Sequence, residues 1–469
     1  MELLPWQFQE INSKYLITNE AGSFFFCDEN NLKNLINQNI DPIFESFLLN
    51  QNFTYEYEND MSWNNFSYNV FKRKKIDHNI NYLILVPTLR CNLNCSYCQV
   101  SRVNENVLGY DWDEETLNLY ERFISMQETK QIKIEFQGGE PTLRPDLLKK
   151  IIDITTKYIP QSEFVICTNL SNLSTELIDL YSNSNVFIST SLDGPLLTHK
   201  NQRTANEYQT TNFYNNLEEI INKFGFDKVS ALPTITNFNE IEKVIDEYAN
   251  FGFTNIFLRP VNFQGFARKS FKKNSFDTSS WKKSYLRAID YIFQRNFISD
   301  HKMKEFNFEN SLKRIFHPGS NGFVDLRTPN FHGRDYMVID YDGTYYPTDE
   351  SRMMSRIGLI DMNIGSLKNG YNESKINQLN INQFNETDPD CIHCAYQQYC
   401  GVDNVDMISR YNTIDIPKFE TFFCNTNMFY FDQIFKRISQ KKDIDIFNIN
   451  GHLTDIFTTD NYFINHYYD

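Results

Sequence analysis

Three cysteines at Cys-x3-Cys-x2-Cys spacing constrain this chain more than any other feature. Cys91, Cys95 and Cys98 follow an apolar run, 82–86, that is typical of a buried strand in a parallel sheet. Three thiolates on one short loop can bind three irons of a four-iron, four-sulfur cluster, and the fourth iron keeps an open coordination position. A structural zinc loop is the alternative, but zinc needs four closed ligands and no fourth Cys or His lies nearby.

The composition indicates a folded, acidic protein of two or three domains. The chain has 469 residues, of which 41% are apolar and 15% aromatic. With this composition we do not expect long disordered segments. A net charge of -15 opposes binding to a phosphate backbone, and we therefore expect no nucleic-acid partner. The first residues lack a basic flank and an apolar core, and no run approaches the length of a membrane span. We expect a cytoplasmic protein with no membrane partner.

From residue 80 the chain alternates between strand-like and helix-like segments. The predicted strands are 82–88, 132–137, 164–168, 186–190, 228–235 and 255–261, and the predicted helices between them are 113–126, 146–158, 175–181, 213–224 and 239–251. Right-handed crossovers would curl such a parallel sheet toward a barrel. The fold class is therefore α/β, and functional residues are expected just after each strand.

The N-terminal residues, up to about residue 75, predict a separate small α+β unit. Two short strands, 15–18 and 23–27, flank a hairpin turn, and helices are expected at 32–40 and 42–49. The unit suits either peptide recognition or capping of the barrel. The basic run 71–75 is interpreted as a solvated linker face, with docking of an acidic peptide as a minor alternative.

A second cysteine group lies in the C-terminal third. Cys391, Cys394 and Cys400 are closely spaced and Cys424 follows. Four thiols can form the full ligand set of a closed iron–sulfur cluster or of a zinc site.

Short polar motifs follow the second, third and fourth predicted strands. They are Gly138-Gly139-Glu140-Pro, Thr168-Asn169, and Ser191-Leu-Asp193-Gly-Pro followed by Arg203. Each could be a plain turn or, for Arg203, a surface residue. The cysteine loop and these motifs follow one another in the order seen in the radical S-adenosylmethionine (radical SAM) enzymes, and the chain therefore resembles that family. The resemblance implies a partial (β/α)6 barrel.

The resemblance implies a role for each motif residue. Cys91, Cys95 and Cys98 would bind the [4Fe-4S] cluster, whose fourth iron binds S-adenosylmethionine (SAM), and one-electron reduction of SAM would yield a 5′-deoxyadenosyl radical. The implied SAM contacts are Tyr97 at the adenine, Gly138, Gly139 and Glu140 at the ammonium, Thr168 and Asn169 beside the cofactor, Ser191 and Asp193 at the ribose, and Arg203 at the carboxylate. A guanidinium suits a carboxylate because its fork of donors matches both oxygens.

The C-terminal part resembles the SPASM extension of peptide-modifying radical SAM enzymes. Such extensions usually hold two auxiliary clusters, but here Thr348 and Asn404 stand where cysteines are expected. The resemblance therefore implies one auxiliary [4Fe-4S] cluster, on Cys391, Cys394, Cys400 and Cys424. Asp349 follows Thr348 and, like an Asp of the sulfatase-maturing relatives, is predicted to take a proton from the substrate radical; a turn residue is the alternative.

Longer matches such as Glu135-Phe-Gln-Gly-Gly-Glu-Pro and Cys394-Ala-Tyr-Gln resemble the B-type maturase of His-Xaa-Ser peptide systems. This implies a ribosomally made precursor peptide as substrate, an electron donor such as flavodoxin or ferredoxin, and C–H modification of the peptide. The expected domains are 1–78, 79–300 and a SPASM-like extension at 301–469. A small-molecule radical SAM enzyme and a non-catalytic, zinc-containing peptide-binding protein remain the alternatives.

Overall fold

The computed structural model describes residues 1–75, 79–100, 102–270, 277–317, 319, 330–440 and 467–468. The main sheet in these ranges has the strand order β12-β11-β10-β9-β6-β15-β16-β17-β18. Its strands are β6 (Tyr82–Leu85), β9 (Gln131–Phe136), β10 (Gln161–Thr168), β11 (Val186–Thr190), β12 (Val229–Ala231), β15 (Tyr336–Ile339), β16 (Thr344–Tyr346), β17 (Gly365–Ser366) and β18 (Gly370–Tyr371). Pairing is parallel from β12 to β15 and antiparallel from β15 to β18.

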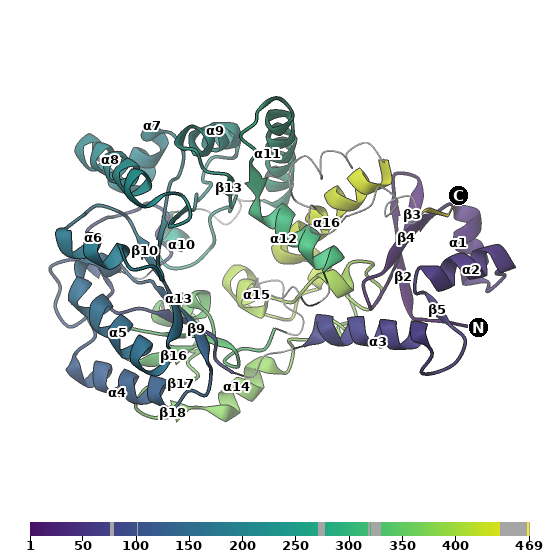
Figure 1. Cartoon of the computed structure of the whole chain (residues 1–469), viewed down its shortest axis with the longest axis horizontal. Coiled ribbons are helices and arrows are strands. Elements are labelled where there is room, and N and C mark those ends of the chain that lie inside the picture. The colour runs from purple at the N-terminus through teal and green to yellow at the C-terminus, as the bar shows by residue number, and fades with distance from the viewer. Residues whose placement is uncertain are drawn as a thin grey trace.

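Helices pack on one face of the parallel part of the sheet (Figure 1). They are α4 (Glu114–Ser125), α5 (Pro145–Tyr158), α6 (Thr175–Tyr181), α8 (Glu207–Phe224) and α9 (Ile241–Phe251). The sequence explains their positions, because each has an apolar stripe and several begin at a capping side chain: Asp113 accepts from the Thr116 amide at α4, and Ser174 from the Leu177 amide at α6. The predicted α/β fold is confirmed.

The sixth predicted strand, 255–261, forms only in part. Its first two residues are β13 (Asn255–Ile256), which pairs with β14 (Lys304–Glu305) instead of extending the main sheet. Contact with the fifth predicted strand is limited to a bridge between Ile235 and Pro260. Two local causes explain this: proline has no N–H for a ladder, and the Leu258 amide donates to the buried Glu305 carboxylate at 3.1 Å.

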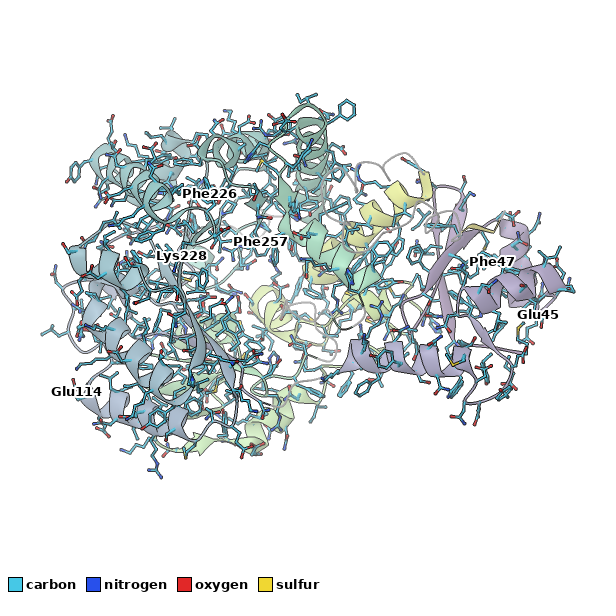
Figure 2. The ribbon with its side chains drawn as sticks, in the orientation of Figure 1. Glu45, Phe47, Glu114, Phe226, Lys228 and Phe257 are labelled. Carbon is cyan, nitrogen blue, oxygen red and sulfur yellow. The ribbon has the colours of Figure 1, made fainter. Side chains whose placement is uncertain are left out.

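The N-terminal unit contains the predicted hairpin and helices. Its sheet has the order β19-β4-β3-β2, with β2 (Trp6–Ile11), β3 (Lys14–Asn19), β4 (Phe24–Cys27) and β19 (Tyr467–Tyr468), and α1 (Glu29–Ile36) and α2 (Pro42–Asn50) follow. Aromatic side chains fill its core, where the ring centroids of Phe25 and Phe47 lie 5.3 Å apart. Figure 2 labels Phe47 at this end of the molecule. The unit lies at the opposite end of the molecule from α4 to α6 (Figure 1).

The basic run at 71–75 is not a solvated linker face throughout, so that part of the prediction is wrong. It belongs to α3 (Met61–Lys74), and Arg73 is only 6% exposed. Its guanidinium donates to the carbonyl oxygens of Ala21, Arg314 and Ile315 at 2.7, 2.7 and 3.0 Å. The last two belong to the C-terminal turn of α12 (Phe306–Phe316), whose carbonyls have no partner within the helix. Arg73 thus joins the N-terminal hairpin to the C-terminal half.

None of the helices in the described ranges combines the length and the apolar character that are needed to cross a bilayer.

The contact between Gly22 and Arg73 gives a stability prediction. Gly22 has φ +86°, and a Cβ atom there would lie 2.0 Å from the Arg73 guanidinium. Gly109 has nearly the same φ, +84°, but nothing lies within 4 Å of its added Cβ. We expect Gly22→Ala to lower the free energy of unfolding by about 1–3 kcal/mol more than Gly109→Ala, because both incur backbone strain but only the first displaces a buried side chain. Equal melting temperatures for the two variants would contradict this.

Candidate functional site

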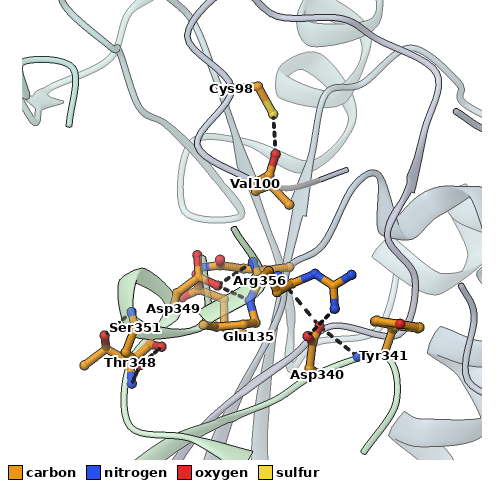
Figure 3. A network of polar contacts seen from close by, with 11 residues as sticks. Cys98, Val100, Glu135, Asp340, Tyr341, Thr348, Asp349, Ser351 and Arg356 are labelled. Carbon is orange, nitrogen blue, oxygen red and sulfur yellow. Dashed lines mark hydrogen bonds and ion pairs between the residues drawn. The ribbon is translucent and has the colours of Figure 1, made fainter. Parts of the chain in front are cut away.

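The first cysteine loop lies over the carboxyl end of the main sheet. Cys91 ends β7 (Arg90–Cys91), which pairs with β8 (Val103–Asn104), and the residues between form the loop. The loop is held from both sides: the Ser96 amide donates to the Gln202 carbonyl at 2.8 Å, and the Cys98 carbonyl accepts from the Ala267 amide at 3.0 Å. The Cys98 thiol donates to the carbonyl of Val100 at 3.1 Å (Figure 3).

An ion-pair group anchors the base of this loop. The Asp111 carboxylate accepts from Arg90 at 2.7 and 2.8 Å, from Arg144 at 2.8 Å and from the Thr88 hydroxyl at 2.6 Å. These contacts lower the pKa of Asp111 although partial burial opposes the shift. Asp111 has no motif around it, and the sequence analysis missed it for that reason.

Gly138 and Gly139 have a role in backbone packing besides the predicted contact with SAM. An added Cβ on Gly138 would lie 2.2 Å from the Thr88 carbonyl oxygen, and one on Gly139 would lie 2.2 Å from the Arg90 carbonyl oxygen. The two glycines let the chain after β9 approach the backbone that leads into the cysteine loop, and the Gly139 amide donates to Thr88 at 3.0 Å. Close approach to the protein's own backbone, and not only to a ligand, explains why side chains are excluded here.

Glu140 connects the ends of two strands. Its Oε1 accepts from the Thr142 hydroxyl at 2.6 Å and from the Thr142 amide, and its Oε2 accepts from the Asn169 amide at 2.7 Å. The Asn169 side chain in turn donates to Asn92 in the cysteine loop at 2.8 Å. Burial raises the pKa of Glu140, and the hydrogen bonds to its carboxylate oppose that shift.

Tyr97, Asp193 and Arg203 form one polar group beside the loop. The Tyr97 hydroxyl donates to Asp193 at 2.5 Å and accepts from Arg203 at 2.6 Å, while the Thr234 amide donates to the other Asp193 oxygen at 3.1 Å. Burial raises the pKa of Asp193, and the Arg203 charge partly offsets this. The Arg203 guanidinium also lies 5.8 Å from the centroid of the Tyr97 ring.

A cavity of about 460 Å³ brings most of the predicted residues together. Its lining includes the predicted residues Cys91, Cys95, Tyr97, Cys98, Gly138, Gly139, Glu140, Thr168, Asn169, Ser191, Arg203 and Asp349. Asp193 does not line it and contacts it through Tyr97 and Arg203. The sequence analysis missed other lining residues, among them Glu135, Cys167 and Phe257; Figure 2 labels Phe257 in the middle of the molecule.

Asp349 begins α13 (Asp349–Arg356) at the wall of the cavity. Thr348 caps this helix, because its hydroxyl accepts from the Ser351 amide while Ser351 accepts from the Thr348 amide, both at 3.0 Å. Arg352 is fully buried and contacts one Asp349 oxygen through Nε and Nη2, each at 2.8 Å. Figure 3 shows this network beside Glu135 and Asp340.

The fold brings the second cysteine group together from two segments. Cys391, Cys394 and Cys400 surround the short helix η6 (Gln397–Tyr399), and Cys424 lies in the first turn of α16 (Phe422–Gln440). Burial raises the pKa of Cys424 and of Cys400, and the nearby thiols of Cys394 and Cys424, respectively, raise them further. In the described ranges, no three His, Cys, Asp or Glu side chains are placed to hold one metal ion. Asn404 stands at the other position where a cysteine is expected. It begins α15 (Asn404–Tyr411), and its side chain donates to the Asn382 carbonyl.

The thiols of the first loop are chemically suited to bind the irons of a cluster. Burial raises the pKa of Cys91 to about 12 and that of Cys98 to about 11. Thiolates at such positions need a positive partner, which iron would supply. The donor set therefore fits a [4Fe-4S] cluster.

Comparison with known proteins identifies the fold. Residues 85–273 match the family model of the Radical SAM superfamily. The fold is the radical SAM fold. The superfamily uses a [4Fe-4S] cluster and SAM. This confirms these two predicted cofactors as those of the family.

Solved structures share this fold along most of the chain. Native anSMEcpe with bound AdoMet has a TM-score of 0.60 at 16% identity, covering 80% of this chain and 100% of that chain. Streptococcus suis SuiB bound to the precursor peptide SuiA has a TM-score of 0.50 at 13% identity, covering 87% and 97%. At these identities the likeness shows the fold alone.

Sequence relatives match over shorter segments. The cysteine-type anaerobic sulfatase-maturating enzyme of Clostridium perfringens is 22% identical over 284 residues, which cover 58% of this chain and 74% of that enzyme. The chain spans only 39%, 58% and 52% of three other curated relatives at 31%, 28% and 23% identity. Substrate and reaction are therefore not transferred from them directly.

Arg203 gives a binding prediction for this site. Its guanidinium lines the cavity next to the cysteine loop, so we expect Arg203→Ala to weaken SAM binding by about tenfold to a hundredfold, the cost of one charge-assisted contact. Arg287→Ala is the matched control, because Arg287 forms an exposed ion pair with Glu242. SAM affinity is measured by anaerobic calorimetry at equal iron content. Equal affinity in the two variants would show that Arg203 does not contact SAM.

Proposed function

We propose that the chain is a radical SAM peptide maturase that modifies a C–H position of a ribosomally made precursor peptide. The observation that carries this proposal is the cavity that brings the three-cysteine loop together with the motif residues after three strands and with Asp349. The match to the Radical SAM superfamily supports the radical chemistry. Similarity in fold to SuiB, which was solved with its precursor peptide, supports a peptide substrate.

In this proposal the chain's residues divide into three roles. Cys91, Cys95 and Cys98 would hold the catalytic cluster, which together with bound SAM would supply the radical chemistry needed to abstract a substrate hydrogen. The SAM contacts are those predicted from the sequence. Asp193 accepts from the Tyr97 hydroxyl, which in turn accepts from Arg203. The second cysteine group holds one auxiliary cluster, and an external donor such as flavodoxin or ferredoxin supplies electrons.

Asp349 accepts the proton that the substrate radical loses on oxidation. It lines the cavity, and its contact with Arg352 fixes one oxygen in place. A base must be held within reach of the proton that it removes, which the short, capped start of α13 achieves. A purely structural role at the turn that begins α13 remains the alternative.

The subgroup and the domain division are also part of the proposal. The motif matches favour the B-type maturase of His-Xaa-Ser systems, with a peptide-recognition or capping unit at 1–78, the barrel at 79–300 and a SPASM-like extension at 301–469. We propose a cytoplasmic location. The small-molecule radical SAM enzyme remains the second candidate, and a short precursor gene beside this gene would favour the peptide maturase.

The test is to incubate the anaerobically reconstituted protein with SAM, a reductant and candidate precursor peptides. We expect 5′-deoxyadenosine together with a mass change in one peptide. Zinc without iron or acid-labile sulfide would instead support a binding protein. SAM cleavage with no modification of any peptide encoded nearby would favour a small-molecule substrate.

The two cysteine groups can be separated by substitution. Changing Cys91, Cys95 and Cys98 together to Ala should remove one four-iron cluster and all 5′-deoxyadenosine formation, because the other described residues of the cavity offer no set of three thiolates. Changing Cys391, Cys394 and Cys400 to Ala is the matched control and should leave the cavity cluster intact. Iron, sulfide and 5′-deoxyadenosine are measured for both. Any SAM cleavage left in the first variant would contradict the assignment.

Asp349→Asn tests the proton acceptor. Asparagine keeps the shape of the side chain and removes its basicity, so this variant should still cleave SAM but form at least about tenfold less modified peptide, a typical loss for one acid–base group. Asp342→Asn is the control, because Asp342 is exposed in the nearby turn. Melting curves show whether the loss of the Arg352 contact alters folding. Unchanged product yield from a folded Asp349→Asn variant would make the base role untenable.

A further inference from the structure

Cys167 lies within strand β10 and its side chain lines the cavity. Side chains of β10 alternate between the two faces of the sheet: Phe164 and Ile166 are fully buried in the main core, while Cys167 lines the cavity and is only partly buried. The cavity is the one that the first cysteine loop and Asp349 also line. Neither the cluster ligands nor the predicted SAM contacts include this thiol.

A group of polar side chains holds the thiol in place. Cys167 donates from Sγ to Oε1 of Glu135 on the adjacent strand β9 at 3.3 Å. Glu135 also accepts from the Tyr82 hydroxyl at 2.7 Å and from the Gln137 side chain at 2.6 Å, and all four side chains line the cavity. The group is built from three neighbouring strands, which makes its geometry rigid.

The surroundings of the Cys167 thiol favour its protonated form. Burial raises the pKa of Cys167 well above that of a free cysteine, and Glu135 and Asp349 raise it further. At neutral pH the sulfur therefore keeps its hydrogen, and it is a poor nucleophile or metal ligand. Among ordinary side chains, a thiol has the X–H bond that a carbon radical can cleave most readily.

We propose that Cys167 is a further catalytic residue, which donates a hydrogen atom from its thiol to a carbon radical held in the cavity. This inference rests on the proposed function, because it needs radical chemistry at that place. The inference also goes beyond the proposed function, which requires only abstraction of a substrate hydrogen and oxidation of the substrate radical. The contact with Glu135 positions the thiol along the cavity wall.

The atoms and electrons of this step balance. The S–H bond breaks homolytically and a C–H bond forms, so that the carbon gains one hydrogen atom and Cys167 becomes a thiyl radical. One electron from a low-potential donor of the class already proposed, and one proton passed from solvent through Glu135, restore the thiol. A substrate radical quenched in this way keeps its original oxidation level. Inversion of a stereocentre then becomes available in addition to oxidative modification.

The test follows hydrogen from solvent and needs no peptide. Full-length reconstituted protein, freed of small thiols, is incubated anaerobically in D2O with SAM and dithionite, and the deuterium content of the 5′-deoxyadenosine is measured by mass spectrometry. The cavity offers two kinds of solvent-exchanged hydrogen that a carbon radical can take, the Cys167 thiol and the tyrosine hydroxyls, and the thiol reacts faster. We expect singly deuterated product from the unaltered protein and a fall to natural abundance in Cys167→Ala and Cys167→Ser.

Cys27→Ala is the matched control, because Cys27 is a fully buried thiol in the N-terminal sheet and should not affect deuteration. Retained deuteration in Cys167→Ser, or unlabelled product from the unaltered protein, would overturn this inference alone. Absence of any 5′-deoxyadenosine would overturn the proposed function and this inference with it. The two Cys167 variants must match the unaltered protein in iron content, which separates loss of the donor from loss of the cluster.

A second measurement does not depend on turnover. The reconstituted protein is treated with N-ethylmaleimide with and without S-adenosylhomocysteine, and modified cysteines are located by peptide mass mapping. Because the thiol keeps its hydrogen, we expect Cys167 to react slowly, but faster than the fully buried Cys27, and at least about fivefold more slowly when S-adenosylhomocysteine is present. A Cys167 that reacts no faster than Cys27, or whose reaction S-adenosylhomocysteine does not slow, would contradict the cavity position.

Discussion

The close approach of two backbone segments supports the rest of the site. The chain after β9 lies against the residues that lead into the first cysteine loop, and the amides of Gly139 and Glu140 donate to the carbonyls of Thr88 and Arg90 at 3.0 and 2.8 Å. A side chain at position 138 or 139 would overlap those carbonyls. Because both segments leave adjacent parallel strands, the sheet sets the height of the loop and the two hydrogen bonds fix it. The two hydrogen bonds thus tie the start of the loop that carries the thiols to the sheet.

The same contacts explain why several motif residues serve the fold as well as a ligand. Glu140 ties its own turn to the Asn169 amide, and Asn169 reaches the cysteine loop through Asn92. Removing the Glu140 carboxylate would leave the Asn169 amide without this partner, at a cost of about 1–3 kcal/mol for a buried donor. Effects of Glu140 variants on SAM binding are therefore mixed with effects on folding. Arg203, which contacts the rest of the protein mainly through Tyr97, separates the two more cleanly.

How much the sequence predicts depends on the range of the interaction. Five parallel strands and their helices follow from local patterns of apolar residues, and the motifs locate most of the cavity. Interactions between distant segments were missed: β15 joins β6 from a distant part of the chain, and Glu305 takes the amide that would have extended the sixth strand. Arg73 resembles a surface cation in the sequence because its carbonyl partners lie at the far end of α12. The side of the sheet to which Cys167 points follows from the strand's alternation. The sequence does not reveal it, because the residues before Cys167 are apolar on both faces.

Thr348 shows how a lost metal ligand can be compatible with an intact site. The resemblance to SPASM proteins places a cysteine at this position, where a cluster would hold the chain in place. Here Thr348 caps α13, a role for which cysteine is a poor choice, and the helix begins at Asp349. One turn later Arg352, fully buried, contacts the Asp349 carboxylate and lies 3.7 Å from Asp340. A capping box and buried ion pairs thus hold Asp349 at the cavity wall, so a cluster ligand at position 348 is not needed to fix it there.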